Sequence, residues 1–260
     1  MENSSAAAAA AAAKCRRATS ADLEAVSTLL SLEVTRPDDG YALCRALELD
    51  GSRPDTVAYF REYVKSSRIL DFLEAPESQA HSVVAEDESA RVVGAYLAKA
   101  VTAAEFLSFL GTASSSPTAR WGGYAALDRY ALASAQCDRL ARPLCVRLFE
   151  GHAVERLLHS GPSVVSESWQ HGALFTQLFA TQIAAALSSG CDMAVGNAVR
   201  VHAVRVARRF GAVPFCRVDY ASLKDRDGGP LLVRPVDGGE TTCKTYLYRL
   251  LKAPPVKARL

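Results

Sequence analysis

Strand-like and helix-like segments alternate through the C-terminal half of the chain, and this order limits the fold more than any other feature. Apolar runs at 156–165 and 191–195 have the length of buried strands, and the Gly-Pro pair at 161–162 predicts an irregularity in the first. Apolar residues recur every four positions between the two runs, which predicts an amphipathic helix over 173–187 that Gly190 ends: Phe175, Phe179, Ile183 and Leu187. A second helix follows and is stopped by Gly211, with its own apolar stripe: Val199, Ala203, Val206 and Phe210.

The remaining segments complete a sheet around these helices. The chain returns through a strand-like segment at 213–223, turns at the Asp/Gly-rich residues 225–229 and closes with 241–251. Upstream, 80–101 consists of two strand-like runs joined by an acidic turn, which predicts an antiparallel hairpin. The order predicts an α/β fold, with a mixed, mostly antiparallel central sheet flanked by helices on both faces.

The N-terminal half is predicted to be mainly helical. Thr19 and Asp22 have the spacing of a capping box at the start of a helix whose apolar stripe also includes Glu33 on the same face. A second helical segment follows Pro54. The stretch 101–142 is predicted to be mostly helical, with a Ser/Thr/Gly-rich break at 111–123 that we interpret as a mobile loop.

Composition narrows the class of protein. The 260 residues suit one domain at 16–252, between an alanine-rich tail at 1–15, expected to be disordered, and a short tail at 253–260. A net charge of +2 argues against nucleic acid as a partner, and no window is apolar enough to span a membrane. The seven cysteines lack metal-ligand spacing, so we expect no metal site. A cytoplasmic monomer is the resulting expectation.

Local strings, in their order along residues 17–251, resemble the GNAT superfamily of N-acetyltransferases, particularly its arthropod-type arylalkylamine branch. "RRATSADLEAVSTLL" looks like the opening strand and first helix of that family, and "RVVGAYLAKAV" like its entry hairpin. "LFEGHAVERLL", "VVSESWQHGALFTQL" and "AVRVARRFGAVPFCRVDYASL" look like the core that binds acetyl-coenzyme A and the closing helix and strands. The resemblance implies one GNAT-like domain, acetyl-CoA as acetyl donor and a small primary amine as acceptor.

The coenzyme loop of the family runs Gln or Arg, two residues, Gly, one residue, then Gly or Ala. Aligned on Trp169, the motif places Gln170 first, Ala173 at the first Gly and Phe175 at the last small position; shifted by one, it places Gly172 and Leu174 there. Small residues would let backbone N–H groups at a helix N-terminus approach the pyrophosphate. The resemblance therefore implies a coenzyme site at Val165, Gln170, His171, Gly172, Ala173, Leu174 and Phe175. The alternative is a helix start that binds no ligand.

The resemblance also implies a base and a proton donor. Glu33 takes the place of the family's base, although the family's Glu-Pro-Leu pattern is absent, and a solvated helix-end carboxylate is the alternative. The family's serine pair falls on Val199 and Ala203, and its tyrosine acid on Ala207, none of which can carry a proton. His202 is the titratable neighbour that could replace them. These departures leave two hypotheses open: an amine N-acetyltransferase, and a catalytically impaired GNAT-fold binding or interaction module.

Overall fold

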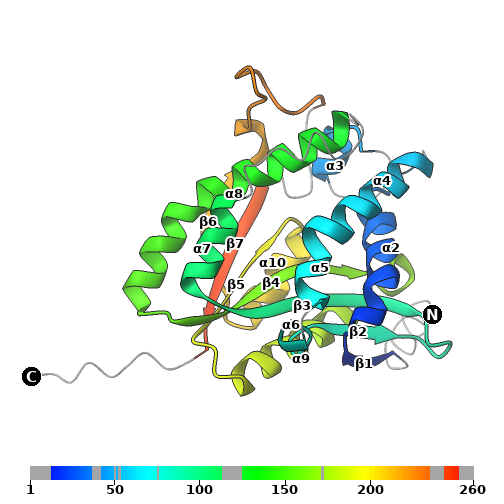
Figure 1. Ribbon diagram of the computed structural model, residues 1–260, viewed down its shortest axis with the longest axis vertical. Helices are drawn as coiled ribbons and strands as arrows, with labels where there is room; N and C mark the ends of the chain where they lie inside the picture. The colour runs from blue at the N-terminus through cyan, green and yellow to red at the C-terminus, as the bar shows by residue number, and fades with distance from the viewer. Residues whose placement is uncertain are drawn as a thin grey trace, which may run out of the picture.

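The computed structural model describes residues 13–36, 42–49, 51, 54–74, 76–112, 125–170, 173–234 and 243–251. These residues contain a seven-stranded sheet in the order β1-β2-β3-β4-β5-β7-β6 (Figure 1). Its strands are β1 (Lys14–Arg17), β2 (Val83–Glu86), β3 (Val92–Thr102), β4 (Arg156–Val165), β5 (Met193–Ala198), β6 (Val213–Asp219) and β7 (Cys243–Leu250).

Strand pairing confirms the predicted mixed, mostly antiparallel sheet. Only β4 and β5 pair in parallel among the described strands, and the expected hairpin is formed by β2 and β3. β1 begins at Lys14, so the sheet includes two residues of the segment expected to be a tail, and Ala13 before it is buried in the core. Pairing with β2 and burial of Ala13 order these residues.

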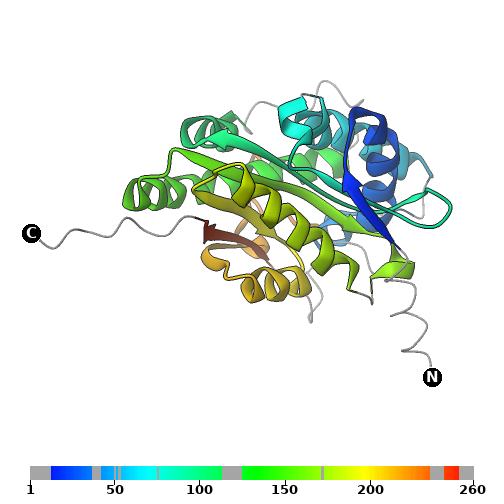
Figure 2. The same cartoon turned by 90° about the horizontal axis from the view of Figure 1, so that it is seen from below.

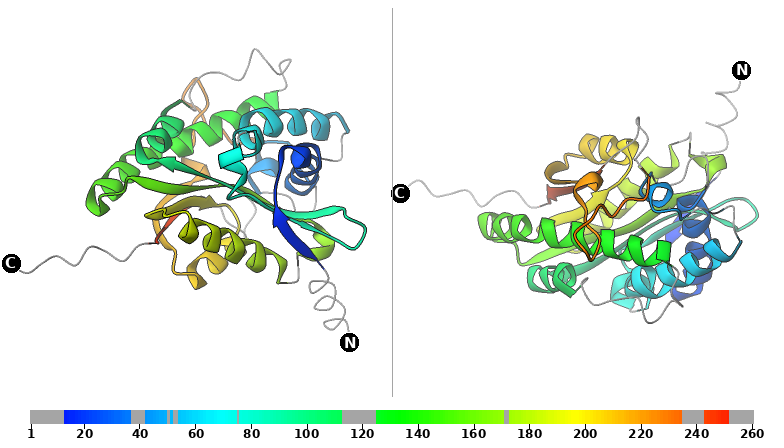
Figure 3. Two further views of the ribbon diagram at one scale, coloured as in Figure 1. Left: turned by 60° about the horizontal axis from the view of Figure 1, so that its bottom comes forward. Right: turned by 90° about the horizontal axis from the view of Figure 1, so that it is seen from above.

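Helices cover both faces of the sheet, as predicted (Figures 2 and 3). One face carries α2 (Leu23–Val34), α4 (Pro54–Val64), α5 (Leu70–Leu73), α7 (Ala103–Thr112) and α8 (Ala125–His152), and the other carries α9 (Leu174–Ser188) and α10 (Val201–Arg209). Two further α-helices are short: α3 (Ala42–Ala46) and α6 (Pro76–Gln79). None of the helices in the described ranges is long and apolar enough to cross a bilayer.

Helix α8 runs further than the sequence predicts. It passes Pro143, beyond the expected end of helical structure at Arg142, and continues to His152. Proline removes one backbone donor, but burial of Cys145 and Phe149 against α7 and β5 stabilises the continued helix. Apart from its first two residues, which end α7, the predicted mobile loop lies outside the described residues.

The Gly-Pro irregularity predicted in β4 is a β-bulge. Tyr96 pairs with Ser163 and Ala98 with Ser160, so Gly161 and Pro162 together face a single residue of β3. A Cβ atom on Gly161 would lie 2.4 Å from the ring of Phe72, so this position needs glycine. The bulge re-aims the C-terminal half of β4 at the place where the strand leaves β5.

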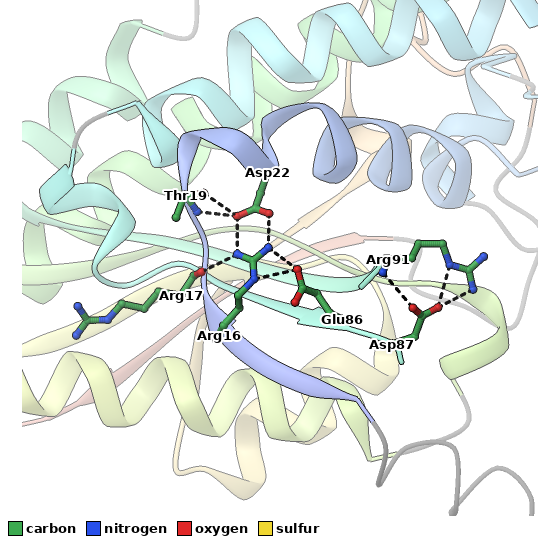
Figure 4. A network of polar contacts seen from close by, with 7 residues as sticks. All are labelled: Arg16, Arg17, Thr19, Asp22, Glu86, Asp87 and Arg91. Carbon is green, nitrogen blue, oxygen red and sulfur yellow. Dashed lines mark hydrogen bonds and ion pairs between the residues drawn. The ribbon is translucent and has the colours of Figure 1, made fainter. Parts of the chain in front are cut away.

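Arg16 of the edge strand β1 connects this strand to Asp22, just before α2, and to Glu86 of β2 (Figure 4). The guanidinium of Arg16 donates to both carboxylate oxygens of Asp22, at 2.7 and 2.8 Å, and to Glu86 of β2. Asp22 also accepts from the backbone N–H of Thr19 at 2.8 Å. This hydrogen bond is one of the two that make up the predicted capping box. Burial alone would raise the pKa of Asp22, but these hydrogen bonds outweigh it and hold the pKa below its ordinary value.

We expect Asp22→Asn to lower the free energy of unfolding at pH 7 by about 1–3 kcal/mol, because Arg16 loses its charged acceptor. The folded-state pKa of Asp22 lies below its unfolded value of about 3.9, so the stabilisation is present above that pH and is lost as the pH falls through the folded pKa. Urea unfolding at pH 7 and below pH 4 measures both effects. A difference between wild type and variant that does not shrink in acid would contradict the assignment.

Candidate functional site

Strands β4 and β5 diverge after a short parallel pairing. Leu157, Leu158 and His159 pair with Met193, Ala194 and Val195, and the pairing stops there although both strands continue. A cavity of about 570 Å³ lies at this divergence and is lined by residues of both strands and of both helix layers. It therefore passes through the sheet, with α9 and α10 on one side and α2, α5, α7 and α8 on the other.

Ser160 and Gly196 are the first residues beyond the paired segment. A Cβ atom on Gly196 would lie 2.7 Å from the Cβ of Ser160, so the strands can separate at this angle only with glycine here. Ser160 Oγ accepts from the buried amide of Gln182 at 3.1 Å and forms a hydrogen bond with the hydroxyl of Tyr96. Burial raises the pKa of Tyr96 to about 12, against the opposing effect of Ser160. Tyr96 is therefore a protonated donor on the cavity wall at neutral pH.

The carboxylate of Glu33 is held at the cavity wall by donors from three parts of the chain. It accepts from the backbone N–H of Glu167 at 2.9 Å, the side-chain amide of Gln170 at 3.0 Å and the guanidinium of Arg36 at 2.7 Å. Its side chain is 13% exposed. Glu33 is therefore a positioned carboxylate at the end of α2, and the alternative of a solvated helix-end side chain is wrong.

Gln170 connects the elements around this part of the cavity. Its amide nitrogen donates to Glu33 and, at 3.1 Å, to the carbonyl of Val165 at the end of β4. Its oxygen accepts from Arg200, which precedes α10, at 3.4 Å. The side chain of Gln170 thus links α2, β4 and the residue that precedes α10.

Aromatic rings occupy the cavity wall on the side of α9 and α10. The ring of Phe175 lies 5.9 Å from Tyr96, 6.5 Å from Phe179 and 6.0 Å from His202, measured between centroids. Phe175 and His202 both line the cavity, so the two helices meet there through these rings. The ring of Phe175 therefore occupies the space between α9 and α10.

The residues predicted for the coenzyme site are placed in different ways. Val165, Gln170 and Phe175 line the cavity, as do the predicted catalytic residues Glu33 and His202. Leu174 is fully buried in the core, where its side chain packs toward Gly94, and Ala173 is the N-cap of α9. Neither side chain lines the cavity, because the apolar face of α9 faces β3 at this position, so the prediction for Ala173 and Leu174 concerns their backbone N–H groups. His171 and Gly172 lie outside the described residues.

A charged group that sequence reasoning missed lies on the opposite wall. Asp138 of α8 accepts from Lys244 Nζ at 2.7 Å and from the hydroxyl of Tyr246 at 2.6 Å. The side chains of Asp138 and Lys244 are 3% and 10% exposed. Burial, followed by the charge of Asp138, raises the pKa of Tyr246 far above its ordinary value, so its hydroxyl stays protonated. All three residues line the cavity.

The sequence contains a signal for this group. Asp138 falls in the helical phase of the buried residues of α8, which include Ala131, Ala135, Ala141 and Cys145. Lys244 and Tyr246 are two residues apart in β7, so their side chains lie on the same face, and the adjacent residues of the strand are also buried. A charge in the phase of a buried stripe needs a partner, and only the fold shows that these two are partners.

His159 lies on the same side of the sheet as this group, among aromatic rings. Its imidazole centroid lies 5.3 Å from the ring of Phe72 and 4.9 Å from those of Phe106 and Phe109. The residue is 6% exposed and lines the cavity. These rings give the compartment under α5 and α7 an apolar, aromatic wall.

Comparison with known proteins identifies the fold. Neither a protein-family model nor a curated protein matches the chain. Solved structures do match it. An agmatine N-acetyltransferase in its apo form superposes with a TM-score of 0.64 at 18% identity, over 92% of this chain and 99% of that chain.

Two insect proteins superpose almost equally well. The polyamine N-acetyltransferase of Drosophila melanogaster, which forms N-acetylagmatine, matches with a TM-score of 0.63 at 16% identity, and a mosquito arylalkylamine N-acetyltransferase-like 5b protein matches with the same values. Both matches cover 92% of this chain and 99% of theirs. The chain therefore has the fold of the GNAT N-acetyltransferases, as the sequence resemblance predicts.

We expect Gly196→Ala to destabilise the fold by about 1–3 kcal/mol, because the added methyl group would overlap Ser160 and push β4 and β5 apart. Gly151→Ala is the matched control, since a Cβ atom there meets nothing within 4 Å and alanine favours the helix. Thermal unfolding of both variants measures the difference. Equal stability of Gly196→Ala and wild type would show that the strands are not in contact at this position.

Proposed function

We propose that the protein is an N-acetyltransferase that moves an acetyl group from acetyl-CoA to a small primary amine, with an arylalkylamine as the substrate class. One observation carries the proposal: the cavity at the divergence of β4 and β5 opens to both helix layers. Two substrates that approach from opposite faces of the sheet can meet there. Holding both reactants in one geometry supplies a large part of the rate of such a transfer.

The residues present fit acetyl-CoA on the side of α9 and α10. Beyond His159, β4 pairs with β3 on one edge, but its edge toward β5 pairs with no described strand, so the backbone there can bind the amide groups of an extended arm. The first turn of α9, after Ala173, presents N–H groups that attract a pyrophosphate. Acetyl-CoA supplies the activated thioester. We propose that Gln170, Ala173 and Phe175, with His171 and Gly172 between them, surround its phosphate end.

Glu33 is the proposed base. Alkylamines are mostly protonated at neutral pH, with pKa values of about 10, and must lose a proton before they attack a thioester. The carboxylate of Glu33 lies on the cavity wall and is fixed by Arg36, Gln170 and the backbone of Glu167. This fixed position allows it to take a proton from an ammonium group directly or through one water molecule.

The departing thiolate of coenzyme A needs a proton. We propose that this proton comes from a residue other than the serine pair or the tyrosine that the family uses. Val199, Ala203 and Ala207 carry no proton at the family's positions. Tyr96 is a protonated hydroxyl beside Ser160, at the point where β4 and β5 separate, and His202 lies on the same side of the sheet. We assign Tyr96 or His202 as the donor to the sulfur atom.

The amine is proposed to bind on the side of α2, α5, α7 and α8. The rings of Phe72, Phe106 and Phe109 line the cavity there. An aromatic wall favours the aryl group of an arylalkylamine over the second cationic group of a polyamine, which carboxylates would bind better. This preference distinguishes an arylalkylamine from a polyamine as the substrate.

A second function is a ligand-binding module without turnover. Phe175, whose ring narrows the groove between α9 and α10, and the missing serine pair and tyrosine favour it. Calorimetric titration of acetyl-CoA into the purified protein, followed by assays with tryptamine, serotonin and dopamine, separates the two. Micromolar binding with amine-dependent release of coenzyme A thiol supports the enzyme. Binding without thiol release supports the module, and no binding excludes the proposed reaction.

We expect Glu33→Gln to lower kcat by roughly 100-fold or more, because an amide cannot accept the proton of the substrate. Glu24→Gln on the same helix is the control, since its exposed side chain pairs with Lys65 away from the cavity. Thiol release with a saturating amine measures both variants. The loss in Glu33→Gln should shrink as the pH rises toward the pKa of the amine, and a loss independent of pH would point to a structural role.

Phe175→Ala is expected to tighten acetyl-CoA binding by about threefold or more, because removal of the ring widens the space between α9 and α10. Phe210→Ala is the control, since Phe210 contacts Phe179 but does not line the cavity. Calorimetry gives both dissociation constants. Weaker binding in Phe175→Ala alone would mean that the ring contacts the coenzyme.

A further inference from the structure

A buried ammonium group with unused donors faces the cavity on the side of α8. A lysine ammonium has three N–H donors. Lys244 donates one to Asp138 and lies 5.1 Å from the centroid of the Tyr246 ring, and its other two N–H groups have no partner among the described residues. The side chain is nine-tenths buried and lines the cavity. Donors in this position need an acceptor that enters the cavity.

The charge around Lys244 limits which acceptor fits. Its positive charge is balanced by Asp138 at 2.7 Å, and Tyr246 is neutral. A carboxylate added here would bring an unbalanced charge into a buried place, and a second cation would lie beside the ammonium group. A neutral oxygen can accept the free N–H groups without either cost. The neighbouring wall of the cavity is aromatic, and the ring centroids of His159 and Phe106 lie 4.9 Å apart there.

We propose that Asp138, Lys244 and Tyr246 form a specificity site in which Lys244 donates to a neutral ring hydroxyl at the end of the substrate remote from the amine. The inference rests on the proposed function, because it assumes that the amine occupies the α8 side of the cavity. It predicts selection for hydroxylated arylalkylamines over those with a bare ring and over those with a ring carboxylate.

The test compares three amines that differ only at the ring: phenethylamine, tyramine and 4-(2-aminoethyl)benzoic acid. We expect wild type to favour tyramine over phenethylamine by about tenfold or more in kcat/KM and in calorimetric affinity, as one hydrogen bond to a charged donor would give. The ring carboxylate should be the poorest of the three. Equal values for tyramine and phenethylamine, or a preference for the carboxylate, would overturn the proposal.

The matching variant is Asp138→Asn with Lys244→Met, which removes both charges together and so leaves neither buried alone. In this variant the ratio of kcat/KM for tyramine to kcat/KM for phenethylamine should fall to near one. A merely structural role would lower kcat/KM for both amines and preserve the ratio. Lys224→Met, on an exposed loop, is the control and should keep the wild-type ratio. Circular dichroism and thermal unfolding verify that each variant folds, and the wild-type series alone decides the outcome if the double variant does not.

Failure of the proposed function gives a different result. If tyramine binds more tightly than phenethylamine but no amine releases coenzyme A thiol, the specificity site stands and the acetyltransferase proposal fails. If every amine is acetylated with one value of kcat/KM, the acetyltransferase proposal stands and the specificity site fails.

Discussion

The separation of β4 from β5 is the constraint on which the rest of the structure depends. A parallel pair that stops after three residues leaves a strand edge without a partner in the middle of the sheet. The bulge at Gly161 and Pro162 redirects β4, and Gly196 allows Ser160 to pack at the point of divergence. Helices on both faces bury the outer parts of both strands and leave the cavity between them.

Polar contacts at the cavity wall keep this arrangement in place. Gln170 connects Glu33, Val165 and Arg200, which belong to three separate elements, and Arg36 joins Glu33 to Glu167. On the far wall, Asp138 connects α8 to two residues of β7. Side chains held by several donors lose little freedom when a ligand binds, so such a site is organised before substrate arrives.

Sequence patterns predicted the elements near this cavity well where periodicity was strong. The four-residue recurrence from Phe175 to Leu187 gave α9, and the Gly-Pro pair in 156–165 gave the bulge in β4. They failed after Arg142, where the predicted helical stretch ended, because burial of Cys145 and Phe149 outweighs the hydrogen bond missing at Pro143. The direction of the Leu174 side chain, which packs toward Gly94, depends on the position of α9 above β3 and has no signal in the sequence.

The sequence by itself determined the order of strands and helices, the mixed sheet and the chemistry available at Glu33, Gln170 and His202, because these follow from local periodicity and side-chain type. Only the tertiary structure decided which of these side chains share one cavity. It also paired Asp138 with Lys244, 106 residues away. Contacts between residues so distant in sequence depend on how the helices pack on the sheet, and local patterns carry no record of that packing.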